Sequence, residues 1–274
     1  MKTGISQWAF PGDMPAKSAL ALAKKIGFES FELCVGDEGP VLLNISEKEA
    51  SALRVQADKA GIAITSVASG MGWKYPLSSP DPAVRQKGSE VIERMLQIAR
   101  WVGADSVLVV PGVVTPEVSY DAALENALNT IQDLVPAAEQ AQVCMAIENV
   151  WNKFLLSPVE MRDFVDQFES AHVGAFFDIG NVLLHGYPEQ WISILGKRIR
   201  KVHAKDFRVS AGNLDGFVML MEGDVNWPKV VAALQAVGYA GPLTAEYGPY
   251  PHSCETLLRH CHASLKSIIA LAKS

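Results

Sequence analysis

Cysteine is scarce in this 274-residue chain, which contains only Cys34, Cys144, Cys254 and Cys261. None of them forms a C-x-x-C pair, and reduced, mostly buried thiols are typical of proteins in reducing compartments. Long apolar runs are missing as well. No stretch reaches the roughly 18 apolar residues of a membrane span, and Met1–Ile5 lacks the apolar core of a signal peptide. We therefore expect a cytoplasmic protein with no membrane partner.

Basic residues are in the minority, because 24 Lys and Arg stand against 30 Asp and Glu, a formal net charge of −6. Nucleic-acid-binding proteins normally show a basic face, so this balance argues against a nucleic-acid partner. Linkers, low-complexity tracts and strong internal repeats are also lacking. With 49% apolar residues available for a large core, we expect one domain over residues 1–274.

An alternation of short β-like runs with longer amphipathic segments dominates the sequence. The runs are rich in Val, Ile, Phe and small apolar residues, and turn-prone residues follow several of them. The predicted strands are Thr3–Trp8, Ser30–Cys34, Ala63–Ala68, Ser106–Val110, Cys144–Glu148, Gly174–Asp178, Lys201–His203 and Leu243–Glu246. The predicted helices are Pro15–Ile26, Ser46–Ala60, Ala83–Val102, Tyr120–Ala141, Ser157–Phe168, Pro188–Leu195, Trp227–Val237 and Cys254–Ala272.

Capping signals support these helix boundaries. Ser46 is followed three residues later by Glu49, which spells a capping box, and Ser157 precedes Pro158, a residue suited to a first helical turn. Glycine favours the left-handed position just beyond a helix. Such glycines follow four of the predicted helices: Gly27, Gly61, Gly103 and Gly238.

Eight strands alternating with helices leave two main architectures, a closed barrel and an open doubly wound sheet. An open dinucleotide-binding sheet should show G-x-G-x-x-G after its first strand. The first strand here runs instead into the segment 6–12, Ser-Gln-Trp-Ala-Phe-Pro-Gly, which lacks that spacing. The count of eight and the missing motif both favour a (β/α)8 TIM barrel.

The last four predicted strands all end in residues that can bind a metal: Glu148, Asp178, His203 and Glu246. The carboxyl ends of barrel strands meet on one face, where the active sites of such barrels lie. Three carboxylates close together repel one another unless a cation balances them. Carboxylates with one imidazole suit Mn²⁺, Mg²⁺ or Co²⁺ and accept Zn²⁺. We therefore predict one divalent metal ion and expect Mn²⁺.

These strand ends and the residues after them resemble the xylose isomerase-like TIM barrels of the sugar-phosphate isomerase and epimerase superfamily. The resemblance covers essentially the whole chain. The segments that carry it are Ile147–Phe154, Phe177–Asn181, Val202–Arg208, Glu222–Trp227 and Thr244–Tyr247.

The resemblance to ketose 3-epimerases of this group implies specific roles. Glu148 and Glu246 become the catalytic acid/base pair, and Asp178 and His203 complete the metal site. Arg208 is similar to an arginine that contacts substrate oxygens, with a one-residue difference in spacing. Asn181 stands where those enzymes carry a histidine. The implied reaction moves a proton off and back onto a sugar carbon through a metal-stabilised enediolate.

Further residues are candidates for contact with a sugar or sugar phosphate. Glu32 lies in the second strand and is expected to bind substrate hydroxyls. Trp8 is expected to form part of the wall of the substrate pocket. Lys153 and Lys205 are candidates for binding a phosphate or balancing the charge of the site. A homo-oligomer is the family-level expectation.

Other reactions remain open for the same ligand set. A hydroxypyruvate or aldose–ketose isomerase and an inosose dehydratase-like lyase use similar residues, and fold resemblance alone does not choose among them. A metal-dependent abasic-site endonuclease shares the barrel, but it needs histidines at the earlier strand ends. The segments 69–72 and 111–112 contain none, and a DNA backbone binder should show a basic footprint.

Overall fold

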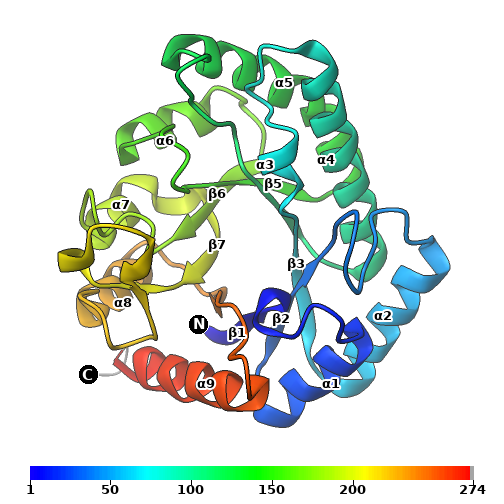
Figure 1. Ribbon diagram of the computed structural model, residues 1–274, viewed down its shortest axis with the longest axis vertical. Coiled ribbons are helices and arrows are strands. Elements are labelled where there is room, and N and C mark those ends of the chain that lie inside the picture. The colour runs from blue at the N-terminus through cyan, green and yellow to red at the C-terminus, as the bar shows by residue number, and fades with distance from the viewer. Residues whose placement is uncertain (272–274) are drawn as a thin grey trace.

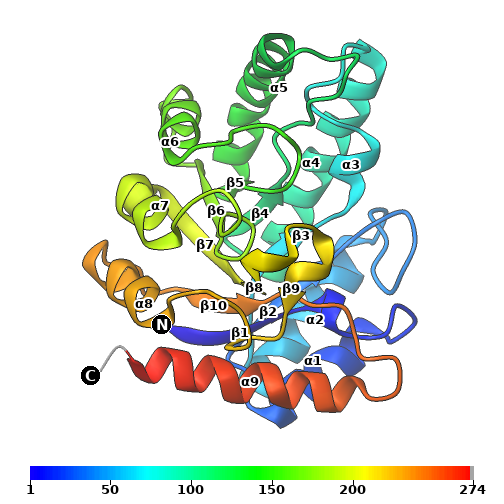
Figure 2. The same cartoon turned by 60° about the vertical axis from the view of Figure 1, so that its left-hand side comes forward.

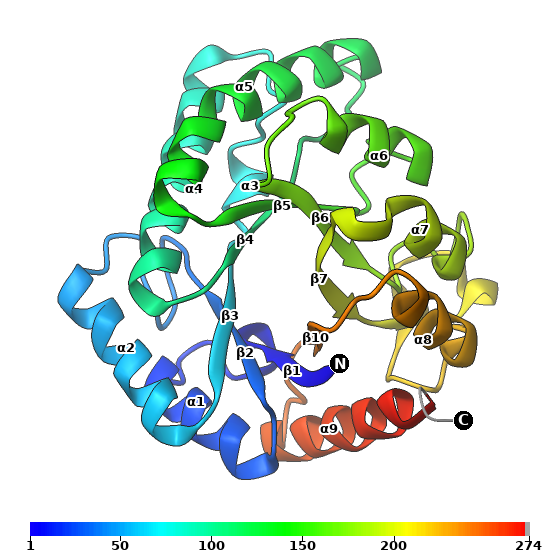
Figure 3. The ribbon, with the colours of Figure 1, turned by 180° about the vertical axis from the view of Figure 1, so that it is seen from behind.

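The computed structural model describes residues 1–271, and within them eight parallel strands close into a barrel with helices on the outside (Figures 1 and 3). Neighbouring strands follow chain order, and pairing of the first strand with the last closes the ring. The predicted TIM barrel is confirmed. Its strands are β1 (Lys2–Ser6), β2 (Ser30–Cys34), β3 (Ala63–Ala68), β4 (Ser106–Val109), β5 (Cys144–Glu148), β6 (Val173–Asp178), β7 (Ile199–Ala204) and β10 (Pro242–Ala245).

The helices that alternate with the strands agree closely with the predicted segments. They are α1 (Ala16–Ile26), α2 (Glu47–Ala60), α3 (Met71–Lys74), α4 (Pro82–Val102), α5 (Tyr120–Ala141), α6 (Pro158–Asp166), α7 (Pro188–Leu195), α8 (Trp227–Ala236) and α9 (Cys254–Ala270). The predicted capping box at Ser46 forms, and Ser157 forms a second one with Glu160. The predicted end of the last helix, Ala272, lies outside the described residues.

Three features differ from the prediction. The short helix α3 matches no predicted segment. The first strand ends at Ser6, and Trp8 lies in a short 3₁₀ turn, Gln7–Ala9, because the Ser6 hydroxyl accepts a hydrogen bond from the Trp8 amide. A short antiparallel hairpin of β8 (Asp206–Phe207) and β9 (Phe217–Val218) stands between β7 and α8 (Figure 2). It was not predicted, because two-residue strands carry no periodicity.

Asp206 holds this hairpin segment in place. The side chain is fully buried. One carboxylate oxygen accepts hydrogen bonds from the amides of Phe207 and Val225, and the other from the Met221 amide and the Trp227 indole, at 2.8 to 3.2 Å. A Cβ on Gly223 would lie 2.2 Å from the carboxylate, so this segment needs glycine there. The loop after β7 is thus tied to the start of α8.

Alternation along the strands decides which side chains face the barrel interior, since residues i and i+2 share a face. Phe176 and Ala146 therefore share faces with Asp178 and Glu148. They pack in a small buried cluster with Ala68, Leu108 and Val110. The cluster forms an apolar floor below the polar strand ends.

Among the helices of the described residues, none combines the length and the hydropathy that a membrane-spanning segment needs.

Candidate active site

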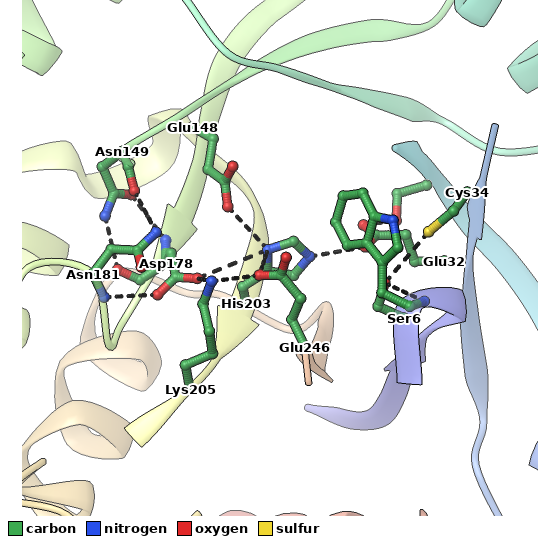
Figure 4. Close-up of polar contacts among 12 residues, drawn as sticks. Ser6, Glu32, Cys34, Glu148, Asn149, Asp178, Asn181, His203, Lys205 and Glu246 are labelled. Atoms are coloured by element: carbon green, nitrogen blue, oxygen red, sulfur yellow. Dashed lines mark hydrogen bonds and ion pairs between the residues drawn. The ribbon is translucent and has the colours of Figure 1, made fainter. Parts of the chain in front are cut away.

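The four predicted strand-end residues come together in space. Glu148, Asp178, His203 and Glu246 each offer one ligand atom, and these atoms all lie within 4.8 Å of one another. Figure 4 shows the four side chains pointing toward a common centre. Nδ1 of His203 lies 3.1 Å from Glu148 Oε1, 3.1 Å from Glu246 Oε2 and 3.9 Å from Asp178 Oδ2. Apart from partly buried Glu246, the residues are buried.

Asn149 fixes the position of Asp178. Its side-chain amide donates to the Asp178 carbonyl and accepts from the Asp178 amide, both at 2.8 Å. The amide of Asn181 donates to Asp178 Oδ1, and the side chain of Asn181 donates to the Asn149 carbonyl. These bonds leave Asp178 Oδ2 to face the cluster (Figure 4). The sequence placed Asn149 in a family motif but did not signal this positioning role.

Glu32 lies on the far side of the His203 ring, away from the other carboxylates (Figure 4). It is fully buried; one oxygen is 2.9 Å from His203 Nε2, and the other accepts a hydrogen bond from Ser66 at 2.8 Å. A carboxylate in this position selects the ring tautomer and orients a ligating imidazole. The prediction that Glu32 binds substrate hydroxyls is therefore not supported by its position, because both of its oxygens are already engaged.

Lys205 provides a cation inside the cluster. Its Nζ lies 3.0 Å from Asp178 Oδ2 and 2.6 Å from Glu246 Oε2. Burial would lower the pKa of Lys205, but the charges of Asp178, Glu246 and Glu148 outweigh it and raise the pKa well above its usual value. Lys205 therefore stays protonated and balances part of the carboxylate charge, one of the two roles predicted for it.

The two glutamates differ in acidity. Burial raises the pKa of Glu148 to about 7, against the opposing hydrogen bond from His203. Burial acts on Glu246 too, but the positive charges of Lys205 and His203 outweigh it and hold the pKa of Glu246 below its usual range. Two carboxyl groups with separated pKa values can hold and accept a proton at the same pH, which is the arrangement of an acid/base pair.

The residues fit a divalent cation. Three carboxylates and one imidazole make a hard-to-borderline donor set. Asp178 Oδ2 and Glu246 Oε2 are buried and face the cluster, where Lys205 Nζ lies 3.0 and 2.6 Å from them. One ammonium group does not balance the charge of the converging carboxylates, so these oxygens are suited to coordinate a further cation.

A cavity of about 460 Å³ opens beside the cluster. Its size falls within the range of small-molecule sites. Glu148, Lys205 and Glu246 supply its charged side chains, and apolar and aromatic side chains make up most of its wall. The other lining residues are Trp8, Ser69, Gly70, Trp73, Leu108, Val110, Val150, Trp151, Asn181, Leu214 and Phe217.

The family model described as xylose isomerase-like TIM barrel matches residues 20–267. The chain belongs to this family. Among curated relatives, L-ribulose-5-phosphate 3-epimerase of Salmonella heidelberg strain SL476 is 26% identical over 246 residues, covering 89% of this chain and 86% of the relative.

Solved structures share the fold. A D-tagatose 3-epimerase-like protein aligns with a TM-score of 0.86 at 22% identity, covering 100% of this chain and 98% of that one. D-psicose 3-epimerase of Clostridium cellulolyticum H10 aligns with a TM-score of 0.81 at 18% identity, covering 99% of both chains. The whole chain therefore has the architecture of these proteins.

The remaining predicted site residues fall into two groups. Trp8 and Asn181 line the cavity beside the cluster. Arg208 does not: it is exposed and donates to the carbonyl of Glu222 at 2.9 Å, because the chain turns outward after β8. Lys153 lines a neighbouring, mostly apolar cavity of about 260 Å³, which shares Val150, Trp151 and Asn181 with the first. The structure thus does not bring Arg208 or Lys153 to the cluster.

Proposed function

We propose that this protein is a metal-dependent carbohydrate epimerase that inverts C3 of a ketose. The observation that carries the proposal is the convergence of Glu148 and Glu246 with Asp178 and His203 on a pocket of small-molecule size. Membership in the family and similarity to named 3-epimerases add support. Mn²⁺ is the proposed ion, because the donor set is three oxygens and one nitrogen.

Each residue has a distinct task in this mechanism. Glu148, Asp178, His203 and Glu246 would hold the cation, which when bound draws electron density from substrate oxygens and acidifies the neighbouring C–H. One glutamate removes the proton from one face of C3, and the other returns a proton to the opposite face. In the metal-free protein the pKa of Glu246 is lowered and that of Glu148 is raised to about 7, so the two glutamates have different environments on the two sides of the cluster.

The reaction is tested by exchange in D₂O. We expect incubation of the metal-loaded protein with a panel of ketoses and ketose phosphates to place deuterium at C3 of one substrate and to yield its C3 epimer. Deuterium at C1 or C2 with an aldose product would instead establish aldose–ketose isomerisation. Loss of water from a keto-inositol would establish a dehydratase. Absence of exchange with every panel member would overturn the proposal.

Metal dependence is tested separately from turnover. After dialysis against a chelator and resupply of Mn²⁺, we expect one equivalent bound per chain and recovery of exchange activity. An Asp178→Asn variant should bind much less Mn²⁺, because it loses a carboxylate that faces the cluster. Full activity in the chelated protein would contradict the proposed cofactor.

Domain organisation and location belong to the proposal as well. We propose that residues 1–274 act as one domain, since the closing strands β1 and β10 come from opposite ends of the sequence. All four cysteines lie among the described residues and are free thiols, which supports a reducing compartment such as the cytoplasm.

A further inference from the structure

The cavity beside the metal-competent cluster is poor in positive charge. Among the described residues that line it, Lys205 is the one Lys or Arg, and no histidine lines it. Lys205 is already engaged by two carboxylates, at 3.0 Å and 2.6 Å from its Nζ. The other charged groups on the wall, Glu148 and Glu246, are acidic. Apart from the proposed metal ion, a phosphate group entering this cavity would meet two carboxylates and, among the described lining residues, no Lys or Arg other than the ion-paired Lys205.

Cations close to the cavity in the sequence are directed elsewhere. Lys74, the neighbour of the lining residue Trp73, forms an ion pair with Asp37 at 2.8 Å. Arg208 donates to the Glu222 carbonyl on the exposed side of its loop. Lys153 is exposed and lines the neighbouring cavity, not this one. A phosphate therefore finds no arginine or lysine fork of the kind that usually recognises it.

Backbone amides do not replace the missing cations. Ser69 and Gly70 precede α3, but this helix has only four residues, and the Ser69 hydroxyl already accepts a hydrogen bond from the Met71 amide. A short helix with an occupied amide lacks the ready donors of a phosphate-binding helix terminus.

Most of the cavity wall consists of aromatic and apolar side chains, which suit the uncharged C–H groups of a sugar. Trp8, Trp73, Trp151 and Phe217 contribute aromatic rings. The Trp151 ring is held in place by a 2.8 Å hydrogen bond to the Asn181 carbonyl, by an edge contact with the Phe207 ring and by a tilted contact with the Phe217 ring. Leu108, Val110 and Val150 complete the apolar surface. Burying a phosphate against such a wall without a partner is strongly unfavourable.

We propose that the substrate is a sugar without a phosphate group, bound with its C–H faces against this aromatic wall. The inference rests on the proposed function and narrows its substrate class. A substrate without phosphate would distinguish this chain from the L-ribulose-5-phosphate 3-epimerase to which it is similar in sequence.

The test compares matched pairs, such as L-ribulose with L-ribulose 5-phosphate and D-fructose with D-fructose 6-phosphate, by C3 deuterium exchange in D₂O. We expect kcat/KM for the free sugar to exceed that for its phosphate by at least about tenfold, which corresponds to about 1.4 kcal/mol. A preference for the phosphate would overturn this inference while leaving the epimerase function standing. Exchange into neither member of any pair would instead overturn the proposed function, and this inference with it.

A variant that adds a positive charge tests whether the lack of cations on the cavity wall disfavours a phosphorylated sugar. Leu214 lines the cavity and is 69% exposed, so Leu214→Arg adds a cation at the rim with little change to the core. We expect the ratio of phosphate to free-sugar kcat/KM to rise on the order of tenfold, because a charge-assisted contact becomes available. Val55→Arg, on exposed α2 outside the cavity, is the matched control and should leave the ratio unchanged. An unchanged ratio in Leu214→Arg would overturn the argument from missing charge.

Discussion

At the scale of single residues, Glu246 is the most exposed of the four potential metal ligands. Its side chain is 18% accessible, lines the cavity, and lies against Lys205 and His203. This combination of partial access and a held position is what a residue needs to exchange a proton with a substrate carbon.

Glu246→Gln should abolish turnover with little effect on the fold. The amide keeps the size of the side chain but cannot accept the proton, so we expect kcat for C3 exchange to fall by roughly 10²- to 10⁴-fold. Thermal unfolding followed by circular dichroism would show whether the fold is retained. Glu125→Gln, on the exposed side of α5, is the control. Activity close to that of the unaltered protein would remove Glu246 from the acid/base role.

Glu32→Gln should weaken metal binding, although Glu32 is not one of the four potential metal ligands. The amide cannot hold the His203 ring as a carboxylate does, and we expect Mn²⁺ affinity to fall about 10- to 100-fold by isothermal titration. Ser66→Ala removes only the hydrogen bond to the other Glu32 oxygen and should have a smaller effect. Equal affinity in Glu32→Gln and the unaltered protein would show that Glu32 is only a packing residue.

The acidity of Glu148 gives metal binding a pH dependence. With a pKa near 7 in the metal-free protein, Glu148 increasingly holds a proton as the pH falls below 7. The proton competes with the cation, so binding releases protons and affinity declines toward pH 6. Titration of Mn²⁺ at pH 8, 7 and 6 checks this; affinity that rises on acidification would contradict it.

The sequence predicted which residues stand at the strand ends, and the structure brings those four together. It did not predict where side chains outside the strand ends point. Glu32 lies within a strand and turns to the back of His203, and Arg208 lies just past β8 and points to solvent. Strand alternation fixes direction only inside a regular strand, and the pairing of β2 with β3 shifts register beside Glu32.

At the scale of elements, the loop between β7 and α8 carries Leu214 and Phe217 to the cavity. Asp206 is its anchor, since four donors converge on one buried carboxylate. The conformation of this loop therefore depends on the side chain of Asp206, which does not line the cavity itself.

Asp206→Ala should destabilise the protein by about 3 kcal/mol, because several buried donors lose a charged acceptor. Urea unfolding measures this change, and KM for the sugar should rise as the cavity wall loosens. Asp215→Ala alters an exposed residue of the same loop whose backbone amide donates to Asn213 Oδ1, a bond that alanine keeps, and it should change stability little. Equal stability of the two variants would show that Asp206 does not anchor the loop.

Elements long enough to show a period were predicted nearly to the residue. β2, β3, β5, α5 and α7 have the predicted bounds. The misses are α3 and the β8–β9 hairpin, each with elements of four residues or fewer. Such short elements form through tertiary contacts such as those of Asp206 and not through local pattern, and they are the segments that shape the cavity.

At the scale of the whole molecule, a bound cation should stabilise the barrel. A ligand that binds only the folded state at 100 times its Kd adds about 2.7 kcal/mol, and for a chain of this size each kcal/mol raises Tm by about 2–4 °C. We therefore expect saturating Mn²⁺ to raise Tm by about 5–10 °C in scanning calorimetry. The Asp178→Asn variant should show a much smaller shift. An equal rise in both would point to binding outside the cluster.

The hydrogen bond between Glu32 and His203 joins residues 171 positions apart, and Glu246 follows the strand that closes the ring against β1. On the ribosome, the nascent chain carries Glu32, Glu148, Asp178 and His203 before Glu246 has been synthesised. A chain released near residue 240 would have three potential ligands, no closing strand and no second glutamate. Catalytic competence should therefore appear only after Glu246 and β10 have been synthesised and β10 has paired with β1, which makes activity a reporter of barrel closure.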